Sequence, residues 1–221
     1  MQYSTFAAID IGSYDVILEI FEISKKQGIR SVDKICHRME LGKDTYTLGK
    51  IRPEMEEELC RVLADFVRIM EDYRVDDYRA TASSAISEAS NSLYVLGKIH
   101  QLTGFSVTVL SNSEQRFLSY KALAAMEDNF NKIIEKGTAI LDLDGGSFQI
   151  SLFDKDALVT TQNIRMGSLR IRERLAGIQS ETEHYEEMVE ELIWNEVSSF
   201  KKMYLKDRKI ENIMLTDLIP K

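Results

Sequence analysis

The chain has 221 residues, of which 44% are hydrophobic, and its formal net charge is -8 at pH 7. This length suits one large domain or two small ones with an ordinary core, and the acidic balance argues against a general nucleic-acid binder, which needs a broad basic surface. The two cysteines form no CxxC pair, the N-terminus lacks the pattern of a signal peptide, and no apolar run is long enough for a membrane span. We therefore expect a cytoplasmic protein without disulfides or contact with membranes.

The first third of the chain opens with a predicted strand meander. Two β-rich runs, residues 5–11 and 16–23, flank the Gly-Ser turn of "GSYD" and predict a hairpin. We expect a third strand over residues 31–39 and a loop over residues 41–51. Pro53 then suits the first turn of an amphipathic helix, whose apolar residues recur every three or four positions.

Helices and strands alternate along the rest of the chain. The expected elements are a strand and loop over 76–86, a helix over 91–102, a strand over 105–110, a helix over 111–126, strands from 138–143 through the next two runs, a helix over 182–204 and a last strand over 210–215. The weakly patterned stretch 127–137 divides a first lobe, 1–126, from a second lobe, 127–221. The order predicts an α/β protein whose sheets are covered by helices.

An internal repeat links the two lobes. "AIDIGSYDVILEIFE" (8–22) is similar to "ILDLDGGSFQISLFD" (140–154), so that Asp10 matches Asp142 and Ser13 matches Ser147. Each segment predicts a hairpin whose turn can bind phosphate through backbone N–H groups and a serine hydroxyl, with an aspartate nearby to hold Mg²⁺ or water. The alternative is two ordinary hairpins with Gly/Ser turns.

Five segments resemble, in order and spacing, the motifs of the Ppx/GppA phosphatases. They are "DIGSYD" (10–15), "ASSAISEASN" (82–91), "SNSEQRFL" (111–118), "DLDGGSFQ" (142–149) and "GSLRI" (167–171). The resemblance spans nearly the whole chain and implies the two-lobed actin/hexokinase/Hsp70-like (ribonuclease H-like) α/β fold. It also implies Mg²⁺-dependent hydrolysis of the terminal phosphoanhydride bond of polyphosphate or guanosine pentaphosphate.

The resemblance also implies which residues form the site. Its catalytic positions are those of Gln115, Gln149 and Asp142, and Mg²⁺ is implied at Asp10 and Asp142. The implied phosphate-binding residues are Gly12, Ser13, Gly145, Gly146, Ser147 and Arg170. A polyphosphate or guanine nucleotide is the implied ligand, and the resemblance leaves a homodimer open.

Several positions depart from the family's pattern. The family has glutamates, which position and activate the attacking water, where this chain has Gln115 and Gln149. A neutral amide cannot accept a proton at pH 7, and loss of a general base typically costs a factor of about 10² to 10⁴ in rate. Asp144 replaces the first glycine of the fourth motif and puts a carboxylate where backbone would cradle phosphate. We therefore expect an impaired phosphatase with little or no hydrolysis.

Two other interpretations remain open. "DLDGGS" also resembles the loop of haloacid-dehalogenase-type phosphatases, in which Asp142 is the nucleophile and Asp144 the acid/base. A second alternative is a non-enzymatic binding or regulatory module with the actin-like fold, in which arginines of "IRMGSLRIRERL" supply positive charge. The family's second lobe continues with a further glycine loop, so we expect the second lobe here to be partial.

Overall fold

The computed structural model describes residues 3–127, 129–177, 184–206 and 208–217. The chain divides into two compact units, residues 1–111 and 112–221. The division lies before the helix of residues 112–126, which the sequence placed in the first lobe, so the units divide at a different position from the expected lobes. Among the described residues, no helix is both long and apolar enough to cross a lipid bilayer.

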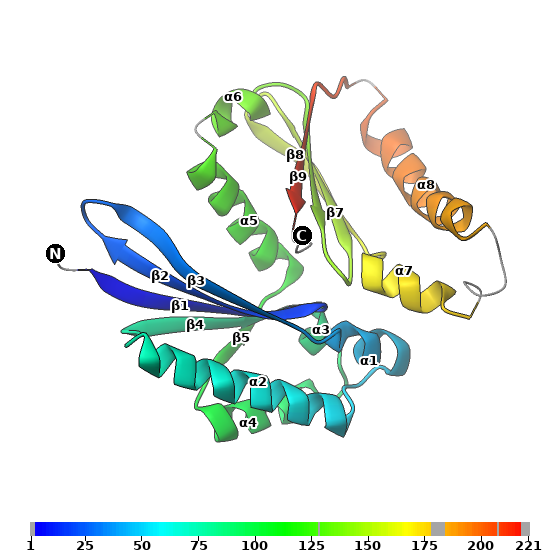
Figure 1. Cartoon of the computed structure of the whole chain (residues 1–221). Coiled ribbons are helices and arrows are strands. Elements are labelled where there is room, and N and C mark those ends of the chain that lie inside the picture. Colours follow the sequence, from blue (N-terminus) through cyan, green and yellow to red (C-terminus); the bar gives the residue numbers. More distant parts are fainter. Residues whose placement is uncertain (1–2, 128, 178–183, 207, 218–221) are drawn as a thin grey trace. The chain divides into compact units, whose positions relative to one another are not determined.

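The first unit is a mixed sheet with helices on one face (Figure 1). Its elements are β1 (Ser4–Ile11), β2 (Asp15–Ser24), β3 (Gly28–Arg38), α1 (Leu41–Leu48), α2 (Pro53–Asp72), β4 (Asp77–Ala82), α3 (Ser84–Ser87), α4 (Ser92–Thr103) and β5 (Val107–Val109). The strand order in the described part is β3-β2-β1-β4-β5, with β1–β2 and β2–β3 antiparallel and β1–β4 and β4–β5 parallel. Alternate residues of β1 and β2, such as Ile9 and Leu18, are fully or almost fully buried beneath α2 and α4.

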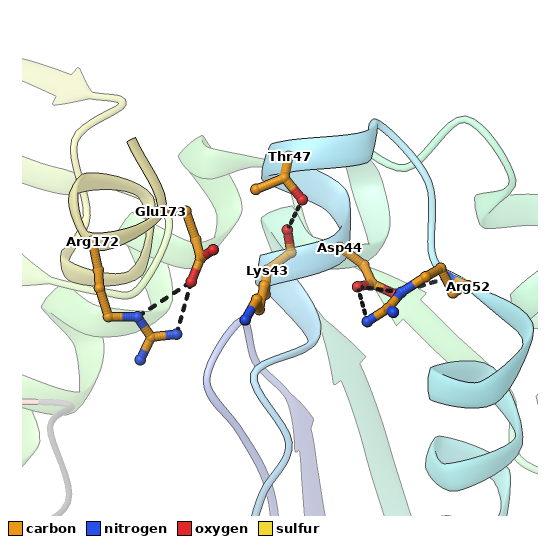
Figure 2. Close-up of polar contacts among 6 residues, drawn as sticks. All are labelled: Lys43, Asp44, Thr47, Arg52, Arg172 and Glu173. Atoms are coloured by element: carbon orange, nitrogen blue, oxygen red, sulfur yellow. Dashed lines mark hydrogen bonds and ion pairs between the residues drawn. The ribbon is translucent and has the colours of Figure 1, made fainter. Parts of the chain in front are cut away.

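Helix α1 was predicted as a loop, and that prediction is wrong. Its glycine and threonines are weak helix formers, so local propensity does not indicate a helix. Tertiary contacts hold it instead. The buried carboxylate of Asp44 accepts hydrogen bonds from the backbone N–H and the guanidinium of Arg52, as Figure 2 shows, and thereby ties α1 to the start of α2. Gly49, at a φ of 70°, ends the helix in the left-handed conformation that glycine adopts without strain.

The second unit is a mixed sheet with helices on both faces (Figure 1). Its elements are α5 (Asn112–Met126), α6 (Phe130–Ile134), β6 (Thr138–Leu143), β7 (Phe148–Asp154), β8 (Ala157–Ile164), α7 (Ser168–Leu175), α8 (Tyr185–Tyr204) and β9 (Asn212–Asp217). The strand order among described residues is β8-β7-β6-β9, and only the β6–β9 pair in that order is parallel.

Side-chain alternation along β7 explains why both faces of the second sheet are covered. Phe148, Ile150 and Leu152 form one apolar cluster with residues of α8. Phe153 points to the other face, where it joins Phe130 of α6 and partly buried residues of α5. The same alternation places Gln149 and Ser151 on the α5 face. Polar side chains of β7 therefore lie on the side of the sheet that faces α5.

Most of the other predicted elements are confirmed. The strands, the long helix from Pro53 and the helix ending before Gly104 lie within a few residues of their predicted ends. Helix α6 falls in the stretch predicted to be a boundary. The last helix was expected from residue 182; residues 182 and 183 lie outside the described part, and α8 begins at Tyr185.

Candidate functional site

The two hairpins of the repeat have the same geometry at their turns. In the first unit the N–H of Gly12 donates to the carbonyl of Asp15, and in the second the N–H of Asp144 donates to the carbonyl of Ser147, both at 3.0 Å. By this bond Ser147 is the counterpart of Asp15. The sequence match of Ser13 with Ser147 is therefore shifted by two positions in the turns.

The aspartates of the repeat also have matching neighbours. Asp10 pairs with Thr81 of the adjacent parallel strand, and Asp142 pairs with Thr216. The Thr216 hydroxyl donates to Asp142 Oδ1 at 2.8 Å, whereas the Thr81 hydroxyl lies 3.4 Å from Asp10 Oδ1. Each aspartate thus lies beside a threonine hydroxyl, and the hydrogen bond to Asp142 is the shorter of the two.

The turn of the second unit is fastened to the start of α7. The first N–H groups of α7 donate to turn carbonyls, Ser168 to Asp144 and both Leu169 and Arg170 to Gly145. Gly167 makes this contact possible, because a Cβ there would lie 2.4 Å from backbone atoms of the turn. These bonds fix the direction in which the turn presents its side chains.

One transverse row of the second sheet consists entirely of polar side chains on the α5 face. Asp142 lies opposite Gln149 of β7, Gln149 lies opposite Asn163 of β8, and Thr216 of β9 completes the row. Directly opposed residues in a sheet have Cβ atoms about 4.5–5.5 Å apart. The register therefore brings one carboxylate, two amides and one hydroxyl into contact range, and we call these four residues the polar row.

Helix α5 covers the polar row with polar side chains of its own. Ser119 Oγ donates to Asp142 Oδ2 at 3.4 Å. Arg116 donates to the Ser113 and Thr161 hydroxyls at 3.1 and 3.3 Å. Between the helix and the row lies a small cavity of about 20 Å³, whose lining comprises Asn112, Gln115, Arg116, Asp142, Asp144, Ser147, Gln149 and Asn163.

Electrostatics in this cavity are set by two carboxylates and one guanidinium. Burial raises the pKa of Asp144, the N–H of Gly145 opposes that rise, and the charge of Asp142 adds to it. Asp144 Oδ1 accepts this N–H at 2.6 Å. The carboxylate therefore occupies a backbone donor that a phosphate-binding turn would offer to its ligand.

The predicted phosphate-binding residues of the second unit lie together at this turn. Gly145, Gly146 and Ser147 form it, and Arg170 donates through Nε to the Gly146 carbonyl at 2.9 Å. Further along α7, Arg172 is paired with Glu173 at 3.0 Å, as Figure 2 shows. Part of the positive charge of the "RIRERL" segment is thus engaged within the second unit.

The remaining predicted residues, Asp10, Gly12 and Ser13, belong to the first unit. Ser13 is fully buried, and its hydroxyl forms a triangle with Tyr46 OH at 2.6 Å and Ser84 Oγ at 3.3 Å; Tyr46 and Ser84 are 2.8 Å apart. Each hydroxyl carries only one proton. The donors implied for phosphate at Gly12 and Ser13 therefore already have partners inside the first unit.

The sequence motifs did not indicate Asn163, Thr216 or Arg116. Asn163 and Thr216 are found only through strand register, because each lies far along the chain from the motif that it joins. The alternation of β8 would have indicated Asn163 only together with the antiparallel pairing of β7 and β8, which was not predicted from the sequence. Arg116 follows Gln115 inside a quoted motif, but its hydroxyl partners depend on the packing of α5 on the sheet.

The donor set of the cavity suits a hard metal ion better than a soft one. In the described part of the chain no three histidine, cysteine, aspartate or glutamate side chains gather as a metal cluster. The polar row nevertheless offers carboxylate and amide oxygens, which are the ligands of Mg²⁺ and Ca²⁺. Asn163 Oδ1 is buried and has no hydrogen-bond partner among the described residues, so the cavity contains an oxygen in need of a donor or a cation.

Comparison with known proteins decides the family. The profile of the Ppx/GppA phosphatase family matches residues 19–215. The chain belongs to the Ppx/GppA phosphatase family. This membership confirms the resemblance seen in the motifs and excludes the haloacid-dehalogenase-type interpretation of Asp142 and Asp144.

Individual relatives agree with the family assignment. The chain is 22% identical over 174 residues to a bifunctional 3-dehydroquinate synthase/phosphatase of Fusobacterium nucleatum, covering 76% of this chain and 26% of the relative. It is 25% identical over 144 residues to exopolyphosphatase 1 of Mycobacterium leprae, covering 65% of this chain and 41% of the relative. The chain thus spans less than half the length of these curated relatives.

A solved structure confirms the fold. An exopolyphosphatase from Cytophaga hutchinsonii superposes with a TM-score of 0.82 at 19% identity, over 97% of this chain and 67% of that one. The predicted actin/hexokinase-like α/β fold is therefore confirmed, with each unit built on a mixed sheet.

Proposed function

We propose that this Ppx/GppA family member is an exopolyphosphatase-like protein with weak or absent hydrolysis. Its ancestral reaction is the Mg²⁺-dependent hydrolysis of terminal phosphoanhydride bonds in polyphosphate or guanosine pentaphosphate. The observation that carries this proposal is Gln149, which is 8% exposed, lies opposite Asp142 in the polar row and faces the cavity. An amide occupies the place where the family pattern has a glutamate.

The chemistry of the cavity explains why hydrolysis would be slow. Gln115 and Gln149 both line it and can hydrogen-bond a water, but neither can take its proton. The Thr216 hydroxyl donates to Asp142 at 2.8 Å and orients the carboxylate, and the Ser119 hydroxyl lies 3.4 Å from its other oxygen. We propose that this pocket positions a water without activating it, and loss of a general base lowers rates by about 10² to 10⁴.

The proposal includes Mg²⁺, the metal that the family resemblance implies. Mg²⁺ would be held by Asp10 and Asp142, and when bound it would neutralise charge on phosphoryl oxygens. Each aspartate lies one residue before the end of its strand and beside a threonine hydroxyl. Gly146, Ser147 and Arg170 remain the proposed contacts for phosphate in the second unit.

The alternative function is a non-enzymatic binding or regulatory module for a phosphorylated ligand. The observation in its favour is that both catalytic carboxylates are replaced by amides while the turn and Asp142 are retained. Such a protein would bind polyphosphate or a guanine nucleotide without releasing phosphate.

Two assays separate these functions. Phosphate release from polyphosphate and from guanosine pentaphosphate is measured with Mg²⁺, and thermal stability is measured with the same ligands. Slow release that saturates with substrate supports the impaired phosphatase, and stabilisation without release supports the binding module. Turnover at ordinary enzyme rates, about 1–10³ s⁻¹, would contradict both.

A further inference from the structure

Helix α4 carries little charge for a helix at the surface of the first unit. Only Lys98 among its 12 residues is charged, whereas α2, which covers the same face of the sheet (Figure 1), has nine charged residues among 20. Lys98 forms an ion pair with the buried carboxylate of Glu56 in α2, so this charge is engaged within the unit. Surface helices usually present charged side chains to solvent. The outer face of α4 departs from this rule.

The exposed side of α4 presents large apolar and small residues. Val95 and Ile99 are fully buried in the core of the first unit, and the helical period of about 3.6 residues places Gly97 on the opposite side. Leu93 is 84% exposed, the highest value among the large hydrophobic residues that the structure describes, and Tyr94 is 65% exposed. We define the α4 face as the exposed residues on this side: Leu93, Tyr94, Gly97, His100 and Gln101.

Gly97 lies at the centre of the α4 face, and nothing in the described part of the chain requires a glycine there. It lies within a regular helix and is not among the described glycines with positive φ. A Cβ at this position would meet no described atom within 4 Å. Glycine weakens a helix interior relative to alanine, so its presence lowers helix stability without helping the packing of the unit. A second helix that approaches this backbone closely would explain it.

The charges of the chain indicate what kind of partner fits the α4 face. The net charge is -8 at pH 7, so two copies repel each other in most orientations. A basic partner would be attracted to carboxylates, for example to Glu186 and Glu187 in the first turn of α8, rather than to α4. The α4 face brings no like charges together when it meets a copy of itself. It therefore fits a second copy of this chain better than it fits a charged partner.

The order of residues along the α4 face suits a two-fold contact. Leu93 and Gln101 lie four residues before and after Gly97, about 6 Å along the helix on either side. When two helices cross antiparallel at Gly97, Leu93 packs beside Gln101 of the partner subunit. Tyr94 then reaches the same amide, with which its hydroxyl can form a hydrogen bond. The second half of the contact repeats the first, as in any isologous interface.

We propose that the α4 face is a self-association surface through which two copies of this chain form a two-fold homodimer. One pair of helices is a small interface, in the size range of transient complexes, so the dissociation constant should be about 10–100 µM. Denaturation and thermal melts at concentrations well below that range therefore report on the monomer. The inference concerns the first unit, and it does not depend on hydrolysis or on a ligand of the second unit.

The test is sedimentation equilibrium of the full chain under reducing conditions, over about 1–300 µM so that the expected dissociation constant is bracketed. We expect the average mass to rise from 25.4 kDa toward twice that value. Leu93→Lys should weaken association roughly tenfold or more, because it buries two ammonium groups near the two-fold axis, although it makes the net charge less negative. Gly97→Gln should also weaken association roughly tenfold or more, because glutamine forms helices well and its side chain would hold the two backbones apart.

Ile29→Lys is the matched control. Ile29 is 71% exposed on β3 of the same unit, so the substitution makes the same change in charge away from α4 and should not weaken association. A wild-type chain that stays monomeric up to about 300 µM, above the expected dissociation constant, would overturn the proposal and leave the α4 face for a different partner. Failure of either α4 variant to weaken association, or equal weakening by Ile29→Lys, would place the contact elsewhere. Circular dichroism at low concentration confirms that each variant is folded.

Discussion

The two hairpins of the repeat have the same backbone hydrogen bonding at their turns but different side chains around them. Both have the same turn hydrogen bond and an aspartate beside a threonine of the neighbouring parallel strand. On the next two strands of each sheet, the residues in register with the aspartate are Ile17 and Cys36 in the first unit and Gln149 and Asn163 in the second. One scaffold thus yields a half-apolar row in one unit and a polar cavity in the other, so function follows from side chains rather than from the fold.

The largest expected effect comes from loosening the second turn. Gly167→Ala places a Cβ 2.4 Å from backbone atoms of Asp144 and Gly145, and backbone cannot rotate away as a side chain can. We expect a loss of about 1–3 kcal/mol or more in unfolding free energy, measured by urea denaturation.

Gly97→Ala is the matched control for that substitution. A Cβ at Gly97, inside α4, meets nothing within 4 Å, and alanine is the better helix former by about 0.8–1 kcal/mol. The control should therefore stabilise the protein. Equal effects of the two substitutions would show that the contact between the turn and α7 is unimportant.

The two aspartate–threonine pairs should respond unequally to loss of the hydroxyl. Thr216→Val removes a 2.8 Å hydrogen bond to Asp142, and bonds to charged groups contribute about 1.5–3 kcal/mol. Thr81→Val removes a contact of 3.4 Å, which is long for an O–H donor. Thermal melts should show a clear loss for Thr216→Val and little change for Thr81→Val, and the reverse order would contradict the assignment of the stronger hydrogen bond to Thr216.

Asp144 should make stability depend on pH, whereas Gly12, its counterpart in the first turn, has no group that titrates. Burial raises the pKa of Asp144, so the folded state binds this proton more tightly than the unfolded state, and stability falls as pH rises through the folded pKa. In EDTA, Asp144→Asn should raise the melting temperature at pH 7. The difference in melting temperature should vanish below the ordinary aspartate pKa of about 3.9. A difference that is the same above and below that pKa would show that ionisation of Asp144 does not lower stability.

The smallest expected effect concerns Cys36, the counterpart of Asn163. Cys36 is exposed, but partial desolvation raises the pKa of its thiol, and the charge of Asp15 raises it further. Because the thiolate is the reactive form, alkylation by iodoacetamide should be slow at pH 7 and accelerate as pH rises. Asp15→Asn should accelerate it at pH 8 in a Cys60→Ser background; an unchanged rate would mean that Asp15 has no influence.

Sequence patterns could predict the strands and the long helices because each follows from local periodicity. The helix from Pro53 and the strand ending at Leu143 are examples. Helix α1 could not be predicted, since its glycine and threonines are weak helix formers and the contact between Asp44 and Arg52 holds it. Motif comparison identified Gln115 and Gln149, whereas Asn163 required the register of three strands.

The most direct test of the central claim is phosphate release from polyphosphate with Mg²⁺ by wild type and by the Gln115→Glu, Gln149→Glu double reversion. Gln101→Glu, at the exposed end of α4, is the control for added charge. Using the longest native form of the protein, we predict little release by wild type and by the control, and a gain approaching the factor of about 10² to 10⁴ of a general base in the reversion. Phosphate release by wild type at ordinary enzyme rates, as fast as release by the double reversion, would contradict the account.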